Sequence, residues 1–307
     1  TSGHLLKLNT TDASSASTVF NSVTSTSFTV NGGSYHTNAI GETYVAYLFA
    51  HNDGDGEFGP DADQDIIKCG SFTTNSSSDA SIDLGFEPQW VMIKKVDASG
   101  SWFIIDSMRG FTTGGNDQWL IANGTNSEGS TEFGYLTATG FEITDNFGTN
   151  SEHIYIAIRR GTKVPESADE VFDISTYLSG DIYPSSITPD AALMYYTPGY
   201  DDGTYSYPEI YDRLRGKGGL QTSNTREEKT ARTGAWDYMN SFWGTFASGA
   251  WLWKRAPGFF DVVAYSGDGV AGRTVSHNLG VAPDMIWAKQ RSSSGNSWRV
   301  WYSGIPS

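Results

Sequence analysis

The 307-residue sequence predicts an all-β protein made of tandem antiparallel β-modules of about 100 residues each. Glycine is abundant, with 35 residues, and Phe, Trp and Tyr make up 14% of the chain, whereas charged residues make up only 18%. This composition favours short aromatic strands joined by polar turns over long helices. A strand–turn–strand pattern also occurs three times, which is typical of a repeat protein.

The recurring pattern consists of two apolar runs separated by a polar turn, and it predicts a β-hairpin. Its copies cover residues 83–110, 189–216 and 278–303. The first two copies share a motif in which Asp106 precedes Arg109, and Asp212 precedes Arg213 and Arg215. These residues could form an acid–electrophile pair, but their recurrence favours a structural ion pair or turn cap.

The N-terminal block predicts three strands, at residues 5–11, 26–30 and 41–50. Similar runs follow the first hairpin in the same order, at residues 119–125, 140–143 and 153–160. The N-terminal block therefore resembles the second half of a module whose first half is absent from it.

The repeats divide the chain into four parts. We expect residues 66–161 to form a complete module, 162–258 a complete but divergent one, 1–65 the second half of a module and 259–307 a first half. An isolated half would expose edge strands and an apolar face. The two halves can meet within one chain, a neighbouring copy can complete each half in a head-to-tail assembly, or the sequence is a window from a longer array.

Several classes of partner and location are disfavoured. A net charge of −15 and an isoelectric point near 4.6 argue against nucleic acid and anionic membrane surfaces as partners. No apolar run approaches the length of about 20 residues that spans a membrane. The single Cys69 is expected to be a buried core thiol, and Thr1 to be an internal point of a longer or processed chain.

An acidic loop lies between the N-terminal block and the first complete module. Its alternating carboxylates could wrap a hard cation, so calcium is the one cofactor that the sequence suggests. The spacing does not follow the EF-hand pattern, and a solvated turn between modules is the alternative. The candidate ligands are Asp53, Asp55, Glu57, Asp61, Asp63 and Asp65.

The sequence shows no hydrolase signature, and its five histidines are scattered. Residues 267–272 match G-x-G-x-x-G, but a turn- and strand-like stretch follows in place of the helix that a dinucleotide site requires. The dense charge run at 225–232 is expected to be a solvated loop or short helix. We predict no catalytic and no cofactor-binding residues.

Aromatic residues in the third quarter of the chain could form a platform for sugar stacking, or could belong to the core or to contacts between modules. The stacking candidates are Trp236, Trp243, Trp251 and Trp253. Three sequons make Asn9, Asn75 and Asn123 candidates for glycosylation.

Four stretches resemble repeat modules of uncharacterised structural or fibre-like proteins of tailed phages from aquatic bacteria. They are residues 65–71, 83–90, 8–13 and 276–283. The resemblance covers most of the chain and is weakest from about 171 to 250. It implies jelly-roll or concanavalin-like sandwiches and supplies no catalytic residues.

These observations lead to a non-enzymatic structural protein, a subunit that assembles head to tail with copies of itself into an extracellular filament or virion fibre. A carbohydrate-binding adhesin that recognises cell-surface glycans is the alternative. An enzyme acting on polysaccharide is a third hypothesis and requires two carboxylates that face one cleft.

Overall fold

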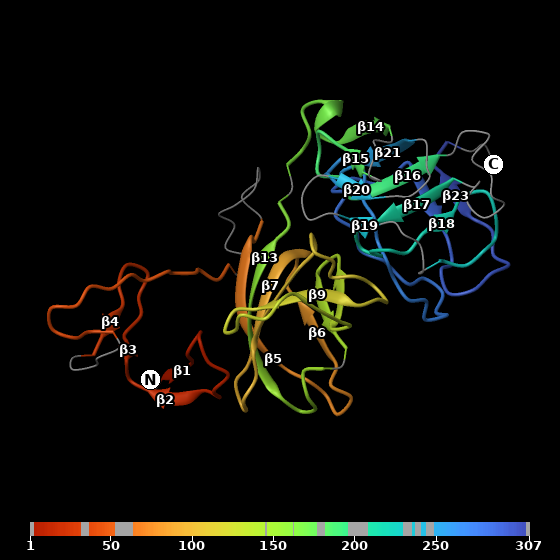
Figure 1. Cartoon of the computed structure of the whole chain (residues 1–307). Helices are drawn as coiled ribbons and strands as arrows, with labels where there is room; N and C mark the ends of the chain where they lie inside the picture. The colour runs from red at the N-terminus through yellow and green to blue at the C-terminus, as the bar shows by residue number, and fades with distance from the viewer. Residues whose placement is uncertain are drawn as a thin grey trace.

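The computed structural model describes residues 3–31, 37–52, 64–144, 146–161, 163–176, 182–195, 208–229, 235–236, 241–243 and 249–304 (Figure 1). The all-β prediction is confirmed, because these residues form strands β1 to β23, every paired strand is antiparallel to its neighbour, and the one helical element is a single 3₁₀ turn, η1 (Ala168–Glu170). Among them, no helix has the length and hydropathy required to cross a bilayer.

The first sandwich consists of two facing sheets. In strand order, the larger sheet contains β10 (Gly129–Thr131), β9 (Asp117–Ile121), β8 (Trp102–Asp106), β7 (Pro88–Lys95), β13 (Glu152–Arg159) and β5 (Ile67–Thr73). The smaller sheet contains β11 (Gly134–Thr137), β12 (Gly140–Ile143) and β6 (Ala80–Asp83).

The core of the first sandwich lies between these sheets because apolar side chains alternate along the strands. The larger sheet contributes Val91, Ile93 and Ala157, and the smaller one contributes Phe141 and Ile143; all five are fully buried. The residues of β13 on either side of Ala157 point to the opposite face of the larger sheet, and equivalent strands alternate in the same way.

The second sandwich repeats this arrangement. Its larger sheet contains β14 (Phe172–Thr176), β21 (Gly249–Trp253), β16 (Ala191–Tyr195), β17 (Glu209–Asp212) and β18 (Leu220–Gln221). Its smaller sheet contains β15 (Ile182–Pro184), β20 (Ser241–Trp243) and β19 (Ala235–Trp236). Its core includes Tyr183, Met194 and Leu252.

The three predicted hairpins are confirmed. The first is β7–β8, the second is β16–β17, and the third is β22 (Met285–Ala288) paired with β23 (Arg299–Tyr302). The predicted structural pair is also confirmed, because the Arg109 guanidinium lies 2.6 Å from the Asp106 carboxylate and the Asp106 Oδ1 accepts the Arg109 backbone N–H. In the second copy it is Arg215 that pairs with Asp212 in the same way.

The strands predicted for the N-terminal block are only partly correct. β1 (Gly3–Leu5) pairs with β2 (Ser15–Ser17), and β3 (Phe20–Asn21) pairs with β4 (Thr29–Val30). The strand expected at 41–50 is not formed: this stretch contains no strand and is exposed throughout. An apolar alternating run forms a strand only where another backbone pairs with it, and no described strand pairs with this one.

Candidate functional site

The N-terminal segment, residues 3–52, is held on the first sandwich by several hydrogen bonds, and three of them join its main chain to the β7–β8 hairpin. The Trp102 indole N–H donates to the Lys7 carbonyl at 3.0 Å, and the Gly100 N–H donates to the Thr11 carbonyl at 2.9 Å. The Ser14 N–H donates to the Val96 carbonyl at 2.8 Å. The turn of the β7–β8 hairpin is therefore attached to the part of the chain that precedes the first sandwich.

Three equivalent hydrogen bonds join the C-terminal segment, residues 259–304, to the second sandwich. The Trp298 indole donates to the Gln221 carbonyl at 2.8 Å, and the Gly295 N–H donates to the Thr225 carbonyl at 2.8 Å. The Glu228 N–H donates to the Arg291 carbonyl at 2.9 Å.

These two sets of bonds correspond residue by residue. The sequence separation is the same from Lys7 to Gln221, from Thr11 to Thr225 and from Ser14 to Glu228. On the hairpin side, Val96, Gly100 and Trp102 correspond to Arg291, Gly295 and Trp298, and the C-terminal hairpin has one extra residue between its glycine and its tryptophan. We call this repeated arrangement the docking contact. It joins each hairpin turn to the segment before it in the same way at both ends of the chain.

The strand pairs within the terminal segments also repeat the first sandwich. β1 and β2 pair in the register of β9 and β10, since Leu5 lies opposite Ser15 where Trp119 lies opposite Gly129. The pair β3–β4 has the register of β11–β12. The hairpin β22–β23 has the register of β7–β8. Each terminal segment is thus a correctly paired part of a sandwich.

Both terminal segments expose large apolar side chains that the complete sandwiches cover. Tyr47 and Leu48 are 80% and 76% exposed in the run that corresponds to the central strand β13. In the C-terminal hairpin, Ile286, Trp287 and Trp301 are 46%, 52% and 52% exposed. Neighbouring exposed apolar side chains of this kind are typical of interaction surfaces.

The two apolar surfaces lie far apart. Figure 1 shows the N-terminal segment at one end of the molecule and β23 with the C-terminus at the other. Among the described residues, no strand pairing joins 3–52 to 259–304. The described parts of the two terminal segments are therefore not paired with each other in this structure.

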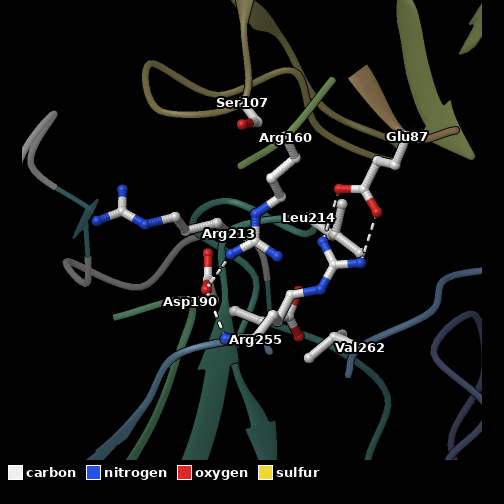
Figure 2. A pocket seen from close by; sticks show the side chains of 9 residues that line it. Glu87, Ser107, Arg160, Asp190, Arg213, Leu214, Arg255 and Val262 are labelled. Carbon is white, nitrogen blue, oxygen red and sulfur yellow. Dashed lines mark hydrogen bonds and ion pairs between the residues drawn. The ribbon is translucent and has the colours of Figure 1, made fainter. Parts of the chain in front are cut away.

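A buried cluster of charges joins the two sandwiches to the C-terminal segment (Figure 2). Arg255, after β21, forms a two-pronged ion pair with Glu87 at 2.5 and 2.6 Å and a third contact with Asp261 at 2.6 Å. Asp190 accepts the Arg255 backbone N–H and pairs with the guanidinium of Arg160.

The charges in this cluster neutralise one another. Burial by itself lowers the pKa of Arg255, but the carboxylates of Glu87, Asp261 and Asp190 outweigh that effect and hold the pKa above its ordinary value. Arg255 and Glu87 are both buried, and both line the small pocket that Figure 2 draws. We call this cluster the charged joint, because its bonds link residues of the first sandwich, the second sandwich and the C-terminal segment.

Most of the predicted calcium ligands, Asp53 to Asp63, lie outside the described residues. Asp65, the last of them, forms an ion pair with Lys68 at 3.2 Å. In the described part of the chain, no group of three or more His, Cys, Asp or Glu side chains is arranged to hold a metal ion.

The described aromatic candidates lie in two places: Trp236 packs on the core, whereas Trp251 and Trp253 share the outer face of β21. The Trp236 ring packs against the second core and lies 4.8 Å from the Arg213 guanidinium carbon. Trp251 and Trp253 face away from that core, where Trp251 packs on Tyr195 at 4.8 Å and Trp253 packs on Phe172 at 5.6 Å. The side chain of Trp243 lies outside the described residues.

The other candidates are placed as follows. Asn9 is exposed, Asn75 caps a turn by accepting the N–H groups of Ser77 and Asp79, and Asn123 accepts the Trp102 N–H. Cys69 is only half-buried, which corrects the expectation of a core thiol, because β5 is the edge strand of its sheet.

The charge run at 225–232 is not simply solvated, as the sequence suggested. In its described part, which ends at residue 229, the Glu228 carboxylate is 8% exposed and pairs with Arg215 at 2.9 Å and Arg291 at 2.7 Å. Residues 267–272 form a loop and a turn that no helix follows in the structure.

A family described as a domain of unknown function (DUF7483) matches residues 1–159 and 253–307, which is more than half of the chain. The chain belongs to this family. The matched residues contain the N-terminal segment, the first sandwich and the C-terminal segment, while nearly all of the second sandwich lies outside them. Neither the curated proteins nor the solved structures contain a match to this chain.

Sequence reasoning missed the charged joint and the docking contact. Arg160 and Arg255 follow corresponding strands, so the shared basic position was a usable signal for the joint. The docking contact uses mainly backbone groups, and side-chain patterns do not report these.

Proposed function

We propose that this protein is a non-enzymatic structural subunit that assembles head to tail, with the C-terminal segment of one copy completed by the N-terminal segment of the next. The docking contact supports this proposal most strongly. Because each terminal segment is already held on its own sandwich as in a continuous stack of modules, joining two copies requires no new kind of contact between modules.

The exposed apolar residues supply the driving force. Burial of one large apolar side chain stabilises an assembly by about 1.5–3 kcal/mol before ordering costs. A surface on one end that fits a different surface on the other end is a heterologous interface, and such interfaces propagate as filaments or close into rings. The resemblance to fibre-like phage proteins favours a virion fibre or an extracellular filament.

The experiment is to measure mass against concentration by sedimentation and light scattering and to image the material by electron microscopy. We expect filaments or rings with a repeat along their length, and a mean mass that rises with concentration. A monodisperse monomer at all concentrations would contradict the proposal.

A carbohydrate-binding adhesin is the second candidate, and the aromatic pair of Trp251 in β21 and Tyr195 in the neighbouring strand β16 favours it. Half-exposed rings of this kind can stack on a sugar face. Binding on a glycan array that is lost in Trp251→Ala would support it, and an array without hits would remove it.

A further inference from the structure

We propose that the two copies join by strand pairing in one defined register, in which residues 43–50 of one copy lie antiparallel to β22 of the other with Ala46 opposite Ala288. This inference rests on the proposed head-to-tail assembly and specifies the surface that each copy presents. It follows from the registers of the two complete sandwiches.

The three copies of the hairpin can be aligned by the proline that each contains near its start. By the hairpin registers, each proline comes two residues before an equivalent position: Pro88 before Trp90, which lies opposite Asp106, and Pro189 before Ala191, which lies opposite Asp212. Pro283 likewise comes two residues before Met285, which lies opposite Tyr302. Counting from these prolines, Ile286 corresponds to Val91 of the first sandwich and to Ala192 of the second.

The strands that pair with the two complete hairpins, β13 and β21, can be aligned by their registers. In the complete sandwiches Val91 lies opposite Ala157 of β13, and Ala192 lies opposite Leu252 of β21. Each of these strands is followed by a basic residue, Arg160 or Arg255, three positions after the core residue.

The run at 43–50 can be aligned with β13 and β21 by the same two features. Its basic residue is His51, and Tyr47-Leu48-Phe49 repeats the aromatic–leucine–aromatic order of 251–253 in β21. Leu48 therefore corresponds to Ala157 and Leu252. It follows that Leu48 lies opposite Ile286, and two residues away Ala46 lies opposite Ala288.

This register places the apolar residues on the correct faces. Val91, Ala157, Ala192 and Leu252 are all completely buried in their cores. Leu48 and Ile286 would therefore meet in the new core. Since side chains alternate along a strand, Tyr47 and Trp287 would pack on the outer face, as the half-buried Trp251 does in β21.

The N-terminal segment would also cover the other edge of the hairpin. Trp119 of β9 lies opposite Ile105 of β8 in the first sandwich. The corresponding residues are Leu5 of β1 and Trp301 of β23, by the registers of their own hairpins. The hairpin β22–β23 would then lie between two strands of the partner, so its exposed edges would both be paired.

Disulfide cross-linking tests the register. Directly opposite residues of an antiparallel pair have Cα atoms about 4.5–5.5 Å apart, within the span that a disulfide bridges. In a Cys69→Ser background, Ala46→Cys and Ala288→Cys are made as separate single variants, mixed, and oxidised with glutathione disulfide. Both changes are small, so each variant keeps its fold.

We expect the mixture to give a disulfide-linked dimer and the double variant to give a ladder of oligomers. The matched control replaces Ala46→Cys with Val45→Cys, whose side chain points to the opposite face. It should yield at least about tenfold less dimer with Ala288→Cys. A second control, Tyr44→Cys, lies two residues out of register, at a separation of about 7–8 Å, and should also be poor.

The outcomes separate this inference from the proposed function. If the Tyr44→Cys mixture cross-links faster than the Ala46→Cys mixture, or if the wild-type chain forms filaments while neither cross-links, the register is wrong and the assembly stands. If the double variant gives only a cross-linked monomer and the mixed single variants give no dimer, the ends pair within one chain and both proposals fail.

Discussion

Ile286→Asp is expected to leave the chain monomeric at concentrations where the wild-type chain assembles. In the isolated chain Ile286 is exposed, so the substitution costs little stability there, within about 0.5 kcal/mol. In the assembly the carboxylate would enter an apolar core opposite Leu48. Burying it without a partner costs at least about 3 kcal/mol, which weakens the interface more than 100-fold.

Leu48→Asp is the matching change at the other end of the chain, and the two variants test directionality together. Each has one intact and one blocked end, so an equimolar mixture should form dimers and no larger species, as measured by sedimentation velocity. Val164→Asp changes an equally exposed apolar residue in the link between the sandwiches and should assemble like the wild type. Filaments of the Ile286→Asp variant alone would show that this surface is not the interface.

Arg255→Met is expected to cause the largest loss of stability among single changes in the joint. The side chain is buried and compensates Glu87 and Asp261, and removing one partner of a buried ion pair typically costs about 3–5 kcal/mol. We expect a lower thermal midpoint and faster proteolysis of the C-terminal segment, because Asp261 anchors that segment to the joint.

The controls for this prediction separate charge from packing. Arg226→Met removes an exposed arginine from a loop of the second sandwich and should change the unfolding free energy by no more than about 0.5 kcal/mol. The double variant Glu87→Met/Arg255→Met removes both buried charges and should recover part of the loss. An Arg255→Met variant as stable as Arg226→Met would mean that the cluster does not hold the modules together.

The hairpins were predictable from the sequence because their signals are local. In β7 an apolar run follows Pro88, a polar turn with Gly100 comes next, and the second run begins at Trp102. Strand period and turn chemistry act over a few residues, so they are visible in one stretch of sequence. Recurrence of the pattern then indicated tandem modules.

The joint could not be predicted because its residues are distant in sequence. Glu87 and Arg255 are 168 residues apart, and no local pattern pairs them. Glu228 illustrates the same limit: in a charge run it resembles a solvated residue, yet Arg215 and Arg291 come from other parts of the fold to cover it.

The run at 43–50 shows why a strand-like sequence is not sufficient for a strand. Its alternation of Tyr47, Leu48 and Phe49 matches β21, but a strand exists only where another backbone accepts its hydrogen bonds. Its copy in the first sandwich, β13, lies between β7 and β5. We attribute the absence of a strand at 43–50 to the absence of a paired strand beside it in the described structure.

Backbone hydrogen exchange as a function of protein concentration tests head-to-tail completion most directly, because it needs no substitution. We expect the amides of residues 43–50 and of β22 to become protected together as concentration rises, while β7 and β13 stay protected throughout. Protection of both terminal stretches that does not change with concentration would mean that they pair within one chain. Rapid exchange at both stretches at every concentration would contradict completion by a second copy.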